Sequence, residues 1–80
     1  MNYRQEFANY TKDQYVEARC NAITFINTGT ANLRIGTFTL TPDAQLSLSG
    51  LSGEVDVTRY QLVFATTGNP SLTVIRKVYV

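Results

Sequence analysis

Apolar side chains recur at every second position in several short runs between residues 22 and 49. Two of these pairs are Ile23 with Phe25, and Leu33 with Ile35. A period of two places the apolar residues on one face of a β-strand, whereas a helix would need spacings of three and four. Strands are therefore predicted at residues 22–26, 33–35, 38–40 and 45–49.

The segments between these strands have the composition of turns. Residues 27–30 contain Gly29, which can adopt a positive φ, and residues 41–44 place Pro42 beside the turn-forming Asp43. Turns this short join neighbouring antiparallel strands, so the pattern predicts a small antiparallel β module.

The second half of the chain continues the alternation. Tyr60, Leu62 and Phe64 share one face of a predicted strand, and Val63 lies on its reverse face, so this strand should be central. The last ten residues, 71–80, carry apolar side chains on both faces. Because such a strand promotes aggregation at a free edge, we expect it to lie inside a sheet or to be covered by a partner.

The first nineteen residues show a different spacing. Tyr3, Phe7 and Tyr10 fall at i, i+4 and i+7, which is one side of a helix. Thr11 stands three residues before a glutamine, as in a capping box, so a second helical turn carrying Tyr15 is expected there. We therefore expect a short, partly helical arm.

These patterns predict an all-β fold. It is a small antiparallel β-sandwich of six or seven strands, jelly-roll-like or barrel-like, preceded by a short N-terminal helical arm. The expected division is an aromatic arm at 1–19 and a β-sandwich domain at 20–80. The main rival is a five-stranded nucleic-acid-binding barrel, which would need basic residues interleaved with exposed aromatics. The candidates for that role are Arg34, Arg59 and Tyr60.

Length and charge limit the functions open to the chain. Eighty residues bury only about 60% of the surface of the unfolded chain, so contacts with a neighbouring subunit would add useful stability. The net charge of +1 provides no strong field that would attract nucleic acid, an anionic membrane or an acidic substrate. A mild positive end remains, because Arg59, Arg76 and Lys77 follow the last acidic residue, Asp56.

The residues of common active sites are missing or isolated. The chain has no His and a single Cys, which excludes an internal disulfide, Ser/His/Asp triads and the common zinc sites. Glu54 and Asp56 could share one face of a strand and bind a cation, but with Val55 pointing into the core they fit a solvated strand face better. Cys20 is expected to be a small buried side chain. No enzyme activity, metal or cofactor is predicted.

The aromatic arm has two interpretations. It can pack over its own sheet and enlarge a small core, or it can reach onto another subunit, since Tyr and Phe are enriched at interfaces. Both can hold in an assembly of identical chains. The predicted partner-binding residues are Tyr3, Phe7, Tyr10, Tyr15, Arg76, Lys77 and Tyr79.

Three segments also suggest a family. The run from Asn21 to Ala31, the tripeptide Leu40-Thr41-Pro42 and the closing stretch from Val74 to Tyr79 resemble the small β-sandwich virion proteins of tailed bacteriophages. The resemblance covers residues 21–80. It implies a structural subunit present in many copies, as a capsid decoration, neck or tail component, with no cofactor and with other protein subunits as partners.

Two other functions remain open. A recognition module could bind carbohydrate or protein through the loops at 49–53 and 66–70. A nucleic-acid binder would use Arg34, Arg59, Arg76 and Lys77, although the weak net charge argues against it. The polar N-terminus has no signal-peptide pattern and no run is long enough to span a membrane, so we expect folding in the cytoplasm, with the virion as the final location.

Overall fold

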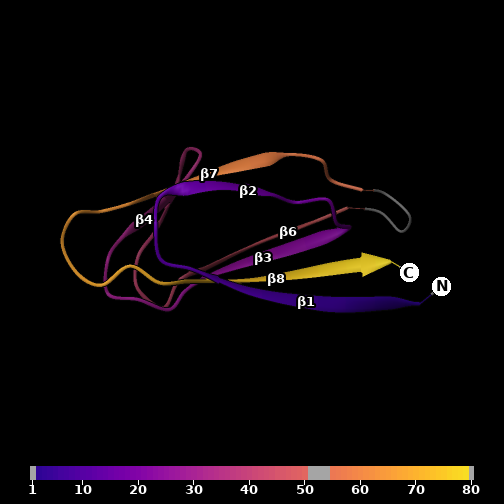
Figure 1. Cartoon of the computed structure of the whole chain (residues 1–80), viewed down its shortest axis with the longest axis horizontal. Coiled ribbons are helices and arrows are strands. Elements are labelled where there is room, and N and C mark those ends of the chain that lie inside the picture. The colour runs from indigo at the N-terminus through magenta and orange to yellow at the C-terminus, as the bar shows by residue number, and fades with distance from the viewer. Residues whose placement is uncertain (1, 51–54, 80) are drawn as a thin grey trace.

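The computed structural model describes residues 2–50 and 55–79, which form two stacked β-sheets (Figure 1). The described residues contain eight strands, all paired antiparallel, and no helix. The strands are β1 (Tyr3–Tyr10), β2 (Gln14–Glu17), β3 (Ala22–Asn27), β4 (Leu33–Ile35), β5 (Phe38–Leu40), β6 (Gln45–Ser49), β7 (Arg59–Phe64) and β8 (Leu72–Tyr79). The all-β prediction is confirmed, but the strand count of six or seven is wrong.

The connectivity is that of a long hairpin rolled up on itself. The first sheet has the order β1-β8-β3-β6 and the second has the order β2-β7-β4-β5. Strands at equal distances from the two chain ends pair with each other: β1 with β8, β2 with β7, β3 with β6 and β4 with β5. Rolling then brings β8 against β3 and β7 against β4. Eight strands connected in this way form a jelly roll.

The predicted helical arm is wrong, because residues 3–17 supply one strand to each sheet. β1 pairs with β8 along its whole length, with Phe7 opposite Ile75 and Tyr10 opposite Leu72, while β2 pairs with β7. Alternation along β1 directs Tyr3 and Phe7 away from the sandwich and Tyr10 towards the core. The spacing was misleading because residues at i and i+4 share a face in a strand as well as in a helix.

The predictions for the later strands are largely confirmed. β7 is central in the second sheet, between β2 and β4, and β8 lies inside the first sheet, between β1 and β3. Residues 55–57 form no strand and contribute only an isolated bridge between Cys20 and Asp56. The expectation that Val55 points into the core is wrong, since it is 63% exposed. Glu54 lies outside the described residues.

The core lies between the inner faces of the two sheets. From the first sheet it contains Ile23 and Phe25 of β3, and from the second it contains Leu62 of β7. The Phe25 and Tyr60 rings meet edge to face across the sandwich, with centroids 5.3 Å apart. Cys20 is buried at 2% exposure, as predicted. The other buried members are Val16, Ala18, Leu33, Ile35, Leu40, Phe64, Leu72 and Val74.

Two loops at one end of the sandwich are held by Asn27 and Gly29. The fully buried Asn27 side chain donates hydrogen bonds to the carbonyl oxygens of Ala31 (2.9 Å) and Leu40 (3.0 Å), and its own oxygen accepts one from the Gly29 N–H (3.1 Å). Gly29 is required for close approach, because a Cβ there would overlap the carbonyl oxygen of Asn69. A positive φ is not found at Gly29, contrary to expectation.

The turn predicted at residues 41–44 is confirmed. The Ala44 N–H donates to the Thr41 carbonyl at 3.0 Å, and Asp43 adopts a φ of 69°. The ring of Pro42 fixes its own φ at about −65°, as the second position of a turn requires, so the chain reverses direction between β5 and β6.

Candidate functional site

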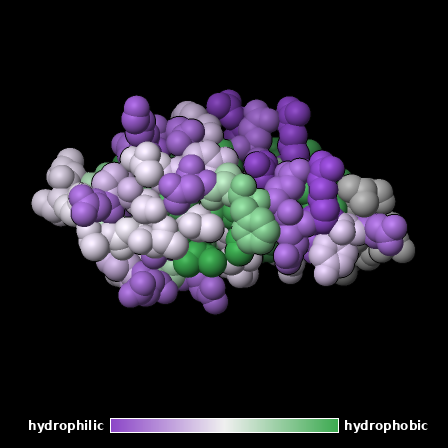
Figure 2. Space-filling view, turned by 60° about the horizontal axis from the view of Figure 1, so that its bottom comes forward, coloured by the Kyte–Doolittle hydropathy of each residue, from purple (hydrophilic) through white to green (hydrophobic). Residues whose placement is uncertain are grey.

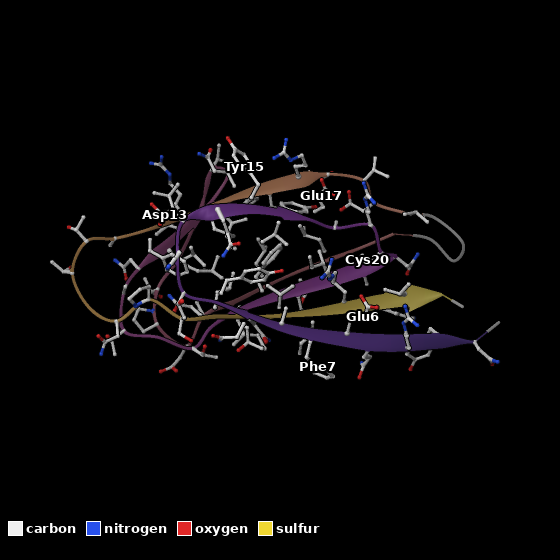
Figure 3. The ribbon with its side chains drawn as sticks, viewed as in Figure 1. Glu6, Phe7, Asp13, Tyr15, Glu17 and Cys20 are labelled. Carbon is white, nitrogen blue, oxygen red and sulfur yellow. The ribbon has the colours of Figure 1, made fainter. Side chains whose placement is uncertain are left out.

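The outward-facing side of the first sheet carries exposed apolar side chains on its first strand. Phe7 is 67% exposed and Tyr3 is 53% exposed, and both lie on β1. In Figure 3, Phe7 points away from the sandwich, whereas Glu6 points towards the space between the sheets. Opposite orientations of neighbouring side chains are the direct result of strand alternation.

Two isoleucines on neighbouring strands extend this apolar surface. Ile75 of β8 is the direct cross-strand partner of Phe7, and Ile26 of β3 lies diagonally beyond it, both partly exposed. We call Tyr3, Phe7, Ile26 and Ile75 the outer strip. Figure 2 shows this side of the molecule, with hydrophobic surface near its middle between hydrophilic groups. An apolar cluster with a polar surround is typical of a surface that another molecule covers.

Polar groups border the outer strip. The Lys77 ammonium lies 4.6 Å from the centroid of the Tyr3 ring, which is a cation–π contact. Hydroxyl groups occupy the neighbouring strand positions, where Thr24 and Ser47 are hydrogen-bonded at 3.2 Å. The strip therefore has an apolar centre and a hydroxyl-rich rim with one cation.

The outer strip adjoins the longest edge strand among the described residues. β1 has eight residues and pairs with β8 alone, whereas the other edge strands, β2, β5 and β6, have four, three and five residues. Every second residue of an edge strand directs its N–H and C=O groups outward, where another strand can bind them. β1 therefore offers backbone hydrogen-bonding groups next to exposed aromatic rings.

Arg76 lies between the sheets and holds them together. Its Nη1 donates to the carbonyl oxygens of Glu17 (2.9 Å) and Ala18 (3.4 Å), which belong to the segment on the opposite sheet. Its Nε is buried and has no hydrogen-bond partner among the residues that the structure describes. The same face of β8 carries Leu72 and Val74, so the alternation of β8 places Arg76 on the interior side.

A second cluster of polar contacts is centred on Asp56. The Asp56 carboxylate accepts hydrogen bonds from the Tyr60 hydroxyl (2.6 Å) and the Thr58 N–H (2.9 Å). Hydrogen bonds from Thr58 and then from Tyr60 lower the pKa of Asp56, and burial with the neighbouring carboxylate raises the pKa of Tyr60 to about 12. Burial raises the pKa of the Cys20 thiol. These shifts keep the carboxylate charged and the thiol and phenol protonated, so neither potential nucleophile is activated.

The second sheet presents a different surface. Tyr15 is 55% exposed on β2, and the guanidinium of Arg59 lies 4.5 Å from its ring centroid. Arg34 is exposed on β4 of the same sheet. The four cations proposed for nucleic-acid binding are therefore divided: two lie on this sheet, Lys77 lies on the first sheet and Arg76 lies between them.

An apolar groove lies beyond the end of β4 and is lined by the first residues of β7 and by β6 of the other sheet. It encloses about 470 Å³, and its apolar lining comes from Ile35, Phe38, Leu46, Leu48 and Tyr60. The sequence pattern did not indicate it, because it results from the short length of β4 relative to β7.

The predicted partner-binding residues do not form one surface. Tyr3, Phe7 and Lys77 lie on the outward side of the first sheet, and Tyr15 lies on the second sheet. Tyr10 packs against the core, and the side chain of Tyr79 lies outside the described part of the structure. Sequence reasoning missed Ile26 and Ile75 as members of the outer strip, although apolar residues on both faces of the last strand were a signal for Ile75.

The described residues contain no helix that is long and apolar enough to cross a membrane. They also contain no group of three or more His, Cys, Asp or Glu side chains that could hold a metal ion. Comparison of the chain with known protein families, with curated proteins and with solved structures found no match.

Proposed function

We propose that this protein is a non-catalytic structural subunit of a larger protein assembly, and that the assembly is a bacteriophage virion in which the chain is a capsid decoration, neck or tail component. The observation that carries the proposal is the outer strip beside the free edge of β1. An edge strand of eight residues with two largely exposed aromatic side chains favours association with another protein chain.

The chemistry of the remaining residues supports a structural role. Two charged groups between the sheets help to hold the fold: Arg76 donates hydrogen bonds to carbonyl oxygens, and Asp56 accepts them from Tyr60 and Thr58. The jelly roll is also an architecture of viral capsid domains, although it occurs in lectins and cupins too. That likeness is an analogy of fold, so the proposal depends mainly on the exposed surface.

The association can be tested with a matched pair of phenylalanine variants. Phe7→Thr removes an aromatic ring from the outer strip but keeps a residue that favours strands. Phe38→Thr removes a ring that is similarly exposed, at 55%, on β5 of the other sheet. Size-exclusion chromatography with light scattering at increasing concentration should show oligomers for the native chain and for Phe38→Thr, and a shift towards monomer for Phe7→Thr.

The virion assignment needs a separate measurement. Mass spectrometry of phage particles purified from cells that produce the protein should detect the chain in many copies per particle, and Phe7→Thr should reduce its incorporation relative to Phe38→Thr. A chain that is absent from purified particles and monomeric at every concentration would contradict the proposal.

A further inference from the structure

We propose that two copies of the chain join through their β1 strands, antiparallel and centred on Gln5, so that the two first sheets become one continuous eight-stranded sheet. This inference rests on the proposed function and identifies the first partner of the subunit as a second copy of itself. It follows from the order of charges and aromatic rings along β1, as the possible registers show.

Symmetry limits the registers to a few. In a dimer with a two-fold axis perpendicular to the sheet, opposite residues must share a face. The axis therefore passes between the two copies of one β1 residue, which lie directly opposite each other, and the register is named below by that residue. An axis at Arg4 would place two arginines opposite each other, and an axis at Glu6 would do the same with two glutamates. Like charges directly opposite in a sheet are unfavourable.

An axis at Gln5 gives favourable pairs on both faces. Arg4 of each copy then lies opposite Glu6 of the other, and Tyr3 of each copy lies opposite Phe7 of the other, with the two glutamines paired at the centre. Opposite charges and aromatic pairs are stabilising cross-strand partners. The rings would also be covered by each other, which removes the two most exposed aromatic side chains of β1 from water.

The ion pair already present in β1 fits this arrangement. Arg4 and Glu6 lie on the same face, with Arg4 Nη2 3.0 Å from Glu6 Oε2, and their side chains are 63% and 38% exposed. Pairing two copies at Gln5 would place the four charges in alternation around the axis, so each arginine would have a carboxylate beside it and another opposite. An axis at Phe7 would instead place the charges opposite Ala8 and Tyr10, with no opposite charge across the interface.

Charge reversal can separate contacts between copies from the contact within one strand. Arg4→Glu gives a strand with two acids, and Glu6→Arg gives a strand with two bases. Each variant alone places like charges across the proposed interface and should dimerise about tenfold or more weakly than the native chain. An equimolar mixture restores both opposite-charge pairs between the copies while each strand keeps its own repulsion. The mixture should therefore regain the dimer, as measured by sedimentation velocity.

Cysteine substitution tests the register directly. Gln5→Cys would face its own copy, and opposite residues in antiparallel strands have Cα atoms about 4.5–5.5 Å apart, within the range of a disulfide. Asn9→Cys, on the same strand and face, would be about 27 Å from its copy, which is eight residues at about 3.4 Å each. Mild oxidation should thus link Gln5→Cys into dimers and leave Asn9→Cys monomeric on non-reducing gels. The native Cys20 is buried and should not contribute.

The outcomes distinguish this inference from the proposed function. Recovery of the dimer in the mixture, together with linking of Gln5→Cys, supports pairing at Gln5. If the native chain associates through Phe7 but the mixture stays monomeric, or if Phe7→Cys is linked faster than Gln5→Cys, the pairing is overturned while the structural role stands. A native chain that remains monomeric at every concentration overturns the pairing, and the particle measurement then decides the structural role. Matching circular dichroism spectra of all variants would exclude misfolding as the cause.

Discussion

Asn27 should be one of the most sensitive positions in the chain. Its side chain is fully buried, and it joins the end of β3 to the loop before β4 and to the last residue of β5. Asn27→Ala removes the donors for the carbonyl oxygens of Ala31 and Leu40, and it removes the acceptor for the Gly29 N–H. Gly29 keeps a partner, because its N–H also donates to the Ser71 carbonyl at 3.1 Å. The main loss is therefore at two carbonyl groups.

The expected magnitude follows from these contacts. A buried polar group that loses its partner costs about 1–3 kcal/mol, so the two carbonyls alone give a decrease of about 2–6 kcal/mol in the free energy of unfolding, and the small cavity adds to it. The whole free energy of unfolding of a domain of this length is about 4–12 kcal/mol at typical values per residue. Asn27→Ala should thus remove a large part of the stability, whereas Asn9→Ala should cost no more than about 1 kcal/mol. Asn9 also makes two side-chain hydrogen bonds, to Ser71 Oγ and the Leu72 carbonyl, but it is exposed.

Urea unfolding at one fixed protein concentration measures the difference, because association would otherwise change the apparent stability. Far-ultraviolet circular dichroism and tyrosine fluorescence can both follow the transition. Asn27→Asp is the sharper variant, since it keeps the shape and the acceptor but replaces the donors with a charge beside two carbonyl oxygens. It should be at least as unstable as Asn27→Ala at neutral pH, and Asn27→Ser provides a milder change if neither folds. Equal stability of the Asn27→Ala and Asn9→Ala variants would refute this account of the buried amide.

Gly29→Ala should destabilise the fold more than Gly36→Ala, because a Cβ at Gly29 would overlap backbone atoms of the facing loop while Gly36 has open space and only its φ of 57° to maintain. The same urea titration checks this, and the order of the two variants is the decisive result; Gly36→Ala should cost about 1 kcal/mol. Tyr60 should ionise with a pKa of about 12, against the ordinary tyrosine value of 10.0. Since the folded-state pKa is the raised one, its contribution to stability is complete below pH 10 and is lost between pH 10 and 12, which absorbance titration of tyrosinate in the native chain and in Tyr60→Phe would reveal.

Local patterns were sufficient for the strands in the middle of the chain. Residues 22–49 alternate with period two, and short turns join them, so their secondary structure and most of their buried positions follow from local sequence, although Phe38 is 55% exposed. The buried positions Ile23, Phe25, Leu33 and Ile35 are those that the alternation placed on one face. Here the information for burial is carried by neighbours within a few residues.

The first strand shows where local reasoning fails. Tyr3 and Phe7 are compatible with a helix and with a strand, and the choice is made by β8, which is almost the whole length of the chain away in sequence. Once β8 provides a hydrogen-bonding edge, the extended form satisfies the backbone groups of β1 and places Tyr10 in the core. A pairing between the two ends of a chain has no signature in either end alone.

The candidate surface was predicted only in part, because the pairing between distant strands determines which residues are neighbours on it. Exposure of Tyr3 and Phe7 could be expected from aromatic residues outside the main core, but their neighbours Ile26 and Ile75 are set by the register between strands. Arg76 was expected to contact a partner. The alternation of side chains along β8 instead directs it between the sheets, where it donates a hydrogen bond to the Glu17 carbonyl oxygen. Moving a residue by one position along a strand is therefore enough to change it from a surface residue to an internal one.

The rolled hairpin gives a physical reason why the candidate surface lies at the beginning of the chain. In this connectivity β8 is inserted between β1 and β3, so the last strand is shielded on both sides and the first strand becomes the edge. Residues of β1 are then the only ones in the first sheet that combine an eight-residue open edge with large exposed side chains among the described strands. Covering that edge would extend the sheet without disturbing any existing pair of strands. Association through β1 is thus compatible with the completed fold of each subunit, whereas association through β8 would require the sheet to open first.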